Sequence, residues 1–208
     1  MPNSSRKYTA REEIFNVATH LPGIIIALAA WFILPCNFTT LNGFACIFYP
    51  LTLLFMFGSS SLHHLIPDAR QRQLFRKFDH CAIYLLITGT YAPLMAYIVP
   101  DWRGAAVMSI LGILTVLGII LKFCRDSRIL HRIEVGIYLL MGWLCVMVAK
   151  PLIAGMSRTG LLLLLAGGLA YTFGVIFYAI KKEFFHAVWH IFVLAGAILQ
   201  LLAILTLR

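Results

Sequence analysis

The chain has 208 residues, of which 61% are apolar and 12% are charged. A soluble domain has about a quarter charged residues and about 45–50% apolar residues. This composition excludes an ordinary soluble globule, a disordered chain, a coiled coil and collagen. It fits a membrane protein, because seven helices of about 20 residues use about 140 residues and leave only short connections. We predict an all-α, polytopic membrane protein with a single domain over residues 1–208.

The chain carries 17 Lys and Arg residues against 8 Asp and Glu residues, a net charge of +9. Because the basic residues lie between apolar runs, their expected partners are anionic lipid headgroups and not nucleic acid. The five cysteines are odd in number and scattered without a CxxC spacing. This pattern predicts neither a disulfide framework nor a cysteine metal site.

Seven apolar runs follow one another along the chain, and each is long enough to cross a membrane as a helix. Thr9-Ala10-Arg11-Glu12 has the spacing of a capping box, so the first helix is predicted to begin near Thr9, within a cytoplasmic segment over residues 1–16. The basic segment 67–78 is expected to lie on the headgroups. The end of the fifth run is the least sharp, because Lys150 and Pro151 fall near it. The runs cover residues 17–36, 43–66, 79–99, 104–123, 134–154, 160–180 and 185–207.

The distribution of basic residues predicts the orientation, because short loops rich in Lys and Arg stay in the cytoplasm. Thirteen basic residues fall on one side of the predicted bundle and four on the other. The N-terminus is therefore expected in the cytoplasm and the C-terminus outside, with the protein in the plasma (inner) membrane. The thirteen are Arg6, Lys7, Arg11, Arg70, Arg72, Arg76, Lys77, Lys122, Arg125, Arg128, Arg132, Lys181 and Lys182, and the four are Arg103, Lys150, Arg158 and Arg208.

Several ionisable or hydrogen-bonding residues lie within the apolar runs, where each needs a partner or a function. With the predicted orientation, four different spans place these residues at the same depth, near the cytoplasmic face. This coincidence is the strongest functional signal in the sequence. The residues are Glu13, Asn16 and His20 in the first span, Ser60 and His64 in the second, Asp79 in the third, and His186 and His190 in the seventh.

Three imidazoles on two helices match the ligands that zinc prefers, and they leave a fourth coordination position open. We predict zinc ligation by His64, His186 and His190. Asp79 would hold the water at the metal or accept its proton, and Ser60 would donate to the oxyanion of a carbonyl substrate. Such a site would hydrolyse an amide or ester of a membrane lipid. The alternative is a cluster of interhelical hydrogen bonds without a metal.

The first span carries three further polar residues, Glu13, Asn16 and His20, which share one helix face. We expect them to close the site and to orient its ligands, the alternative being a solvated helix start. Three other histidines are not predicted to bind the metal. His63 and His80 each neighbour a site residue and so point elsewhere, and His131 is expected to be solvated in a basic loop that begins at Lys122.

At these residues the sequence resembles the bacterial hemolysin III proteins, within the progestin and adipoQ receptor group. The resemblance implies seven helices and a zinc site near the cytoplasmic face with the ligands predicted above. Because the wider superfamily includes alkaline ceramidases, it also implies a lipid amidase. The matching segments are Glu12-Glu13-Ile14-Phe15-Asn16 with Thr19-His20, Ser60-Ser61-Leu62-His63-His64, Phe78-Asp79-His80-Cys81-Ala82-Ile83-Tyr84, Gly89-Thr90-Tyr91-Ala92-Pro93, Tyr138-Leu139-Leu140-Met141-Gly142-Trp143, and residues 186–196.

Three functions remain open from the sequence. The first is a zinc-dependent hydrolase of membrane lipids that contributes to lipid or fluidity homeostasis. The second is a regulator without enzymatic activity that senses lipids through the same site. The third is a pore-forming cytolysin, which the family name suggests. The outer halves of the spans carry few ionisable residues, so a closed pocket fits better than a channel through one chain.

Overall fold

The computed structural model describes residues 8–34, 41–125 and 127–207, and over these ranges the chain is helical with no strand. Seven helical segments of the described chain are long and apolar enough to cross a membrane, which confirms the predicted all-α class and the number of spans. The elements are α1 (Ala10–Ile33), α2 (Leu41–Leu65), α3 (Ala69–Ile98), α4 (Trp102–Cys124), α5 (Arg128–Gly142), η1 (Trp143–Val148), α6 (Ala149–Gly155), α7 (Arg158–Ala179) and α8 (Phe185–Leu205).

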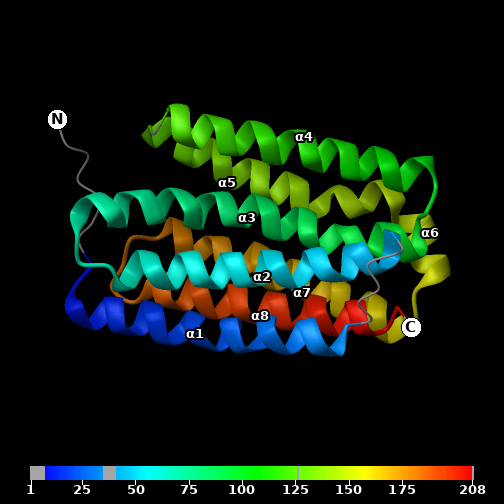
Figure 1. Ribbon diagram of the computed structural model, residues 1–208, viewed down its shortest axis with the longest axis horizontal. Coiled ribbons are helices and arrows are strands. Elements are labelled where there is room, and N and C mark those ends of the chain that lie inside the picture. Colours follow the sequence, from blue (N-terminus) through cyan, green and yellow to red (C-terminus); the bar gives the residue numbers. More distant parts are fainter. Residues whose placement is uncertain (1–7, 35–40, 126, 208) are drawn as a thin grey trace.

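The helices lie side by side along the long axis of the molecule (Figure 1). Helix α2 packs against α1 and α3, α3 also packs against α4, and α8 packs against both α7 and α1. The last helix thus becomes a neighbour of the first. Since the helices alternate in direction, the starts of α1, α3, α5 and α8 lie at the same end of the bundle as the ends of α2, α4 and α7 (Figure 1). This end carries the predicted site.

Local sequence determines where α1 and α3 begin. The capping box predicted at Thr9 is present: the Glu12 amide donates to Thr9 Oγ1 at 3.2 Å, and the Thr9 amide donates to Glu12 Oε2 at 2.9 Å. Asp68 caps α3 by accepting a hydrogen bond from the Gln71 amide at 2.9 Å. From Ala69 on, the basic segment that follows α2 forms the first part of α3.

The fifth span is interrupted by the 3-10 turn η1, between α5 and α6. Pro151 lies in α6, and its missing amide hydrogen removes a helical bond to the residue four positions earlier, inside the turn. Tyr91 satisfies the backbone at the interruption. Its hydroxyl donates to the Gly142 carbonyl and accepts from the Cys145 amide, both at 2.7 Å. Such compensation is needed because lipid offers no hydrogen bonds.

Candidate metal centre

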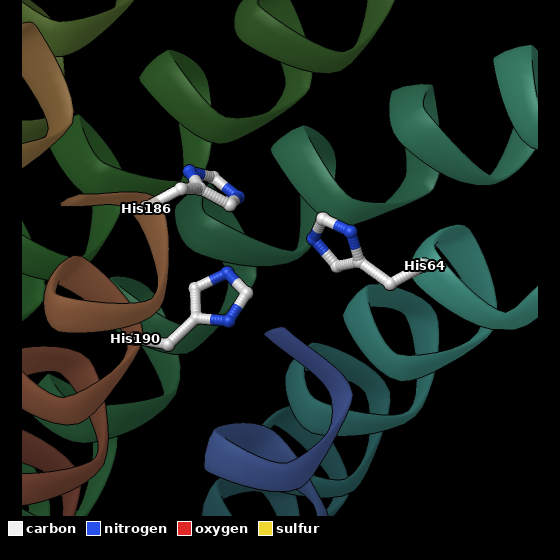
Figure 2. A group of neighbouring side chains, drawn as sticks. All are labelled: His64, His186 and His190. Carbon is white, nitrogen blue, oxygen red and sulfur yellow. The ribbon is translucent and has the colours of Figure 1, made fainter. Parts of the chain in front are cut away.

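Three histidines from α2 and α8 meet at the end of the bundle where α1 begins (Figure 2). His64, His186 and His190 each offer a ring nitrogen within 4.8 Å of the other two. The ring of His64 lies 5.2 Å from each of the other two ring centroids. The fold therefore brings together the three imidazoles predicted from the sequence. We refer to them below as the His64 centre.

Two helix termini position these side chains. His64 lies in the last turn of α2, just before Ile66 and Pro67. His186 lies in the first turn of α8, which follows Phe184 in the left-handed backbone conformation with φ of 60°. His190 is one turn further along α8, so its side chain lies on the same helix face as that of His186. Their rings are 4.4 Å apart.

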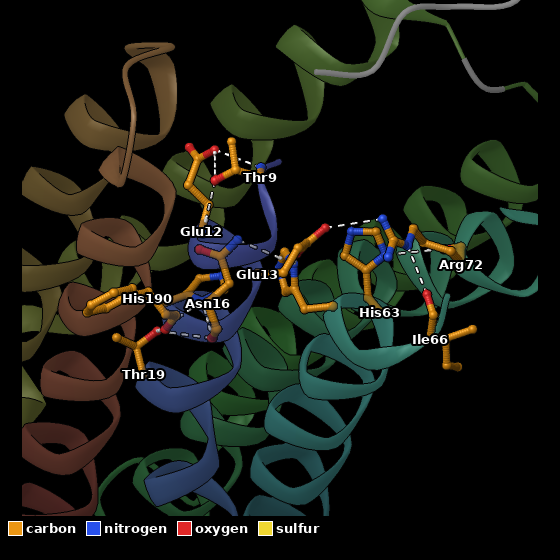
Figure 3. A network of polar contacts seen from close by, with 11 residues as sticks. Thr9, Glu12, Glu13, Asn16, Thr19, His63, Ile66, Arg72 and His190 are labelled. Atoms are coloured by element: carbon orange, nitrogen blue, oxygen red, sulfur yellow. Dashed lines mark hydrogen bonds and ion pairs between the residues drawn. The ribbon is translucent and has the colours of Figure 1, made fainter. Parts of the chain in front are cut away.

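The His64 ring is oriented by a carboxylate from α1. Its Nδ1 lies 2.6 Å from Glu13 Oε2. Arg72 Nη1 donates to the other oxygen of this carboxylate, Glu13 Oε1, at 3.2 Å (Figure 3). Because a carboxylate only accepts, Nδ1 carries the proton and Nε2 keeps its lone pair. Nε2 is buried and has no hydrogen-bond partner among the described residues. A buried lone pair of this kind suits a metal ligand whose other ring nitrogen donates to a carboxylate.

The His190 ring is oriented by the backbone of α1. Its Nδ1 lies 3.0 Å from the Asn16 carbonyl oxygen and 3.3 Å from Thr19 Oγ1 (Figure 3). A carbonyl accepts only, so Nδ1 donates and the Nε2 lone pair is free for a metal. The donor set of the His64 centre thus fits zinc, with three imidazoles of which His64 and His190 have their outer nitrogens held by α1.

The three polar residues of α1 all lie against these ligands. Glu13 contacts His64 as described above, and Asn16 Nδ2 lies 3.4 Å from His64 Nδ1. The His20 ring stacks on His190, with ring centroids 3.6 Å apart. His20 is fully buried, and both its ring nitrogens lack a hydrogen-bond partner within the described chain. The face of α1 is therefore packed against the imidazoles and is not a solvated helix start.

Asp79 and Ser60 lie beside the His64 centre. Asp79, on α3, interacts electrostatically with His64 and faces Ser60. The Ser60 hydroxyl is buried, and no hydrogen bond of normal geometry joins it to any described residue. Asp79 is not part of the group of three close ligand atoms. The two side chains are thus placed next to the imidazoles and not among them.

Sequence reasoning missed two residues at this site. Tyr8 stacks on His186 with ring centroids 5.1 Å apart, and its ring meets that of His64 at 5.8 Å. It lies just before the α1 cap, and nothing in the sequence marks it. Thr19 contacts His190, and its spacing of three residues from Asn16 is a signal that could have identified it.

Of the histidines excluded from the metal ligands, His131 is not where the sequence predicts it. His63 stays outside the three-imidazole group, with Nδ1 3.2 Å from the Arg72 carbonyl oxygen. The expectation that His131 is solvated in a basic loop is wrong. It lies in α5, with Nδ1 3.3 Å from Glu134 Oε2. Lys122, also assigned to that loop, is buried in the last turn of α4.

An apolar cavity of about 120 Å³ lies among the helices, and none of the three histidines lines it. Trp189, next to His190 in the chain, lines it, as does Tyr178, whose ring centroid is 6.2 Å from that of His186. Most other lining side chains are aliphatic or aromatic, from α3, α5, α7 and α8. Thr90, Thr172 and Gln200 provide polar groups. Tyr178 thus links the lining of the cavity to the His64 centre.

The fold and the histidine group define a multi-pass helical membrane protein with a candidate metal site at one end of its bundle. The chain belongs to the haemolysin-III-related family, whose family model matches residues 8–201. The resemblance predicted from the sequence is thereby confirmed.

Relatives from bacteria and from an animal match along most of the chain. It is 34% identical over 195 residues to the hemolysin-3 homolog of Bacillus subtilis (strain 168), covering 91% of each chain. It is 35% identical over 200 residues to the hemolysin-3 of Bacillus cereus, covering 94% of this chain and 91% of the other. It is 28% identical over 220 residues to an adiponectin receptor protein of Drosophila melanogaster, covering 91% of this chain and 49% of the other.

Proposed function

We propose that the protein is a zinc-dependent hydrolase that cleaves an amide or ester bond of a membrane lipid and thereby contributes to membrane lipid or fluidity homeostasis. The observation that carries the proposal is the His64 ring. Its Nδ1 is held by Glu13, while its buried Nε2 has no partner in the described chain and belongs to the group with His186 and His190. Three neutral imidazoles leave one coordination position for water or substrate.

The residues around the imidazoles supply the remaining chemistry. When bound, zinc provides a Lewis acid and a water molecule that ionises near neutral pH. Asp79, next to His64, is placed to accept a proton from the attacking water and to pass it to the leaving group. The buried Ser60 hydroxyl, which faces Asp79, is placed to donate to the oxygen of the substrate carbonyl as negative charge develops there.

The cavity supports a lipid as the substrate. Its walls are mainly apolar, and they include Trp189, the chain neighbour of His190, and Tyr178, whose ring contacts that of His186. An acyl chain in the cavity would place an amide or ester carbonyl at the end lined by Tyr178 and Trp189, toward the imidazoles. Binding energy from the chain would then orient the reacting bond.

The charge distribution supports an orientation with the His64 centre at the cytoplasmic face of the plasma (inner) membrane. The three imidazoles lie at the end of the bundle where α1, α3, α5 and α8 begin and α2, α4 and α7 end (Figure 1). Eleven of the thirteen basic residues assigned to the cytoplasmic side belong to the described chain, and in sequence they fall near these helix ends. Lys and Arg in short loops favour the cytoplasmic side and attract anionic headgroups. The N-terminus would then be cytoplasmic, and the C-terminus, after an odd number of spans, outside.

A regulator that senses lipids without turnover is the second candidate, favoured by the Drosophila relative, which is named a receptor. The names of the Bacillus relatives suggest a cytolysin. The cavity is lined mainly by apolar groups, however, and gives no polar path through one chain. A cytolytic pore would therefore need several copies.

The decisive experiment combines zinc analysis with lipid chemistry. We would purify the full chain, the His186→Ala/His190→Ala variant, Asp79→Ala and the control Asp101→Ala, which removes an exposed carboxylate at the opposite end of the bundle. Zinc is measured by elemental analysis, and membrane lipids with and without each protein are measured by mass spectrometry. We expect zinc in all but the double histidine variant, and a changed lipid profile only with the parent and Asp101→Ala.

The other outcomes separate the candidates. Zinc in the parent with identical lipid profiles for the parent and Asp79→Ala would identify a regulator in place of a hydrolase. No zinc in the parent, or the same zinc content in the double histidine variant, would overturn the metal site itself. Dye release from liposomes that Asp79→Ala does not change would favour a cytolysin.

A further inference from the structure

A second group of polar side chains is buried at the same end of the bundle, away from the His64 centre. His80 comes from α3, Lys122 from α4, and His131 and Glu134 from α5. The side chains of Lys122 and Glu134 are each 2% exposed, that of His80 is 11% exposed and that of His131 is 37% exposed. We call these four residues the Lys122 site.

The contacts in the Lys122 site converge on one carboxylate oxygen. Lys122 Nζ donates to Glu134 Oε2 at 2.9 Å and to His80 Nδ1 at 3.2 Å. An ammonium group has no lone pair, so His80 Nδ1 must be the acceptor. The His80 Nδ1 lone pair, which accepts this hydrogen bond, is the lone pair that would bind a metal ion. His131 Nδ1 lies 3.3 Å from the same Glu134 oxygen, while Oε1 is buried without a partner among the described residues.

The ligand atoms of this group are spaced as they would be around a metal ion. His80, His131 and Glu134 each offer one atom within 4.8 Å of the others. The Nδ1 atoms of His80 and His131 lie 3.5 and 3.3 Å from Glu134 Oε2. In a tetrahedral zinc site with bonds of about 2.0–2.1 Å, neighbouring ligand atoms are about 3.3–3.4 Å apart. Two imidazoles and a carboxylate are also a ligand set that zinc accepts.

The Lys122 ammonium already occupies this group, and its charge opposes a second cation. Lys122 and Glu134 together are neutral, and they are buried. A divalent ion placed beside the ammonium would leave a net charge of about two units in a region of low dielectric, where like charges repel strongly. We propose that the Lys122 site is a cation site whose resident cation is the Lys122 ammonium, which excludes a metal ion from the second histidine group.

The Lys122 site joins helices that the His64 centre does not join. Its ammonium and carboxylate connect α4 to α5, and His80 adds α3. Tyr178 extends it to α7, because its hydroxyl lies 2.6 Å from His131 Nε2. The ammonium thus links α3, α4 and α5 to one another, as a structural metal ion links elements in other proteins. This inference is independent of the proposed hydrolase activity.

The test removes the resident cation and asks whether a metal takes its place. The full chain in detergent is compared with Lys122→Ala and with the control Lys122→Ala/Glu134→Gln, which also removes the carboxylate. Each is loaded with Zn²⁺ or Co²⁺ and desalted. Metal per chain is then measured by elemental analysis, and tetrahedral Co²⁺ by its visible absorption.

We expect Lys122→Ala to hold one more ion per chain than the parent, and the double variant to hold the same number as the parent. Because only the increment over the parent is compared, the result does not depend on whether the His64 centre binds metal. Zn²⁺ should raise the thermal midpoint of Lys122→Ala more than that of the double variant. An unchanged metal content in Lys122→Ala would overturn the inference. A metal ion bound to the parent and lost in Glu134→Gln would also overturn the inference.

A second measurement keeps the inference testable if Lys122→Ala does not fold. Glu134→Gln alone leaves the ammonium buried without its counter-charge, whereas Lys122→Met/Glu134→Gln removes both charges. We expect a lower thermal midpoint for the single variant than for this double variant. Equal midpoints, or a lower midpoint for the double variant, would show that the ammonium is not held by Glu134.

Discussion

The Glu13 carboxylate lies 2.6 Å from Nδ1 of His64, although the two residues belong to different helices. This contact leaves His64 Nε2 as the metal-facing nitrogen. The carboxylate is itself held by Arg72, whose Nε donates to the Ile66 carbonyl at 2.9 Å (Figure 3). One end of α1 thus determines how a histidine of α2 presents its lone pair.

The first prediction concerns metal affinity. Glu13→Ala should weaken zinc binding by about 10- to 100-fold, because the His64 ring loses the group that orients it and raises its basicity. Glu13→Gln should weaken it less, since the amide oxygen still accepts from Nδ1. Affinity is measured by competition with a chelator. Glu183→Gln, which removes an exposed carboxylate near the start of α8, is the control, and an affinity of Glu13→Ala equal to that of the control would contradict the prediction.

The second prediction concerns metal removal. Zinc at the His64 centre would bind the folded chain and tie the end of α2 to the start of α8. Chelation should therefore lower the thermal midpoint, and at a free zinc concentration of about 1,000 times Kd the lost stability is about 4 kcal/mol. Thermal unfolding is recorded with and without chelator. His190→Ala should show no chelator effect, and a parent midpoint that the chelator does not shift would count against the site.

The third prediction concerns the cavity. Gly168 lines it, and a Cβ added there meets no atom within 4 Å, so we expect Gly168→Leu to extend into the cavity and reduce its volume. We expect loss of lipid turnover or lipid binding with zinc content unchanged. Gly112→Leu is the matched control, because Gly112 is also helical and unobstructed but does not line the cavity. Equal lipid binding in the two variants would exclude the cavity as the acyl site.

The fourth prediction concerns the interrupted fifth span. Tyr91→Phe removes the hydroxyl that bonds both the Gly142 carbonyl and the Cys145 amide. Two backbone groups within the span then lose a partner that lipid does not replace, at a cost of about 1–3 kcal/mol each. Denaturant or thermal unfolding should show this loss with zinc content unchanged. Stability equal to that of the parent would mean that the interruption does not depend on Tyr91.

Local features of the bundle followed from the sequence, because they depend on neighbours along the chain. Apolar runs long enough for a bilayer predicted the seven spans, and the Thr9 capping box predicted where α1 begins. The spacing of His186 and His190 placed their side chains on one helix face. Because alternate spans run in opposite directions, the sequence also predicted that His64 and His186 lie at the same end.

The relative positions of side chains on different helices required the tertiary structure. Only the packing of α8 against α1 brings His190 to the Asn16 carbonyl, and no spacing along the chain encodes that contact. Lys122 shows most clearly what the sequence alone does not predict. At the end of an apolar run it was predicted to be a loop residue, since a lysine there normally reaches water. Its burial depends on Glu134 and His80, which α5 and α3 bring to it, and a charge of this kind is stable within the bundle only because packing supplies its partners.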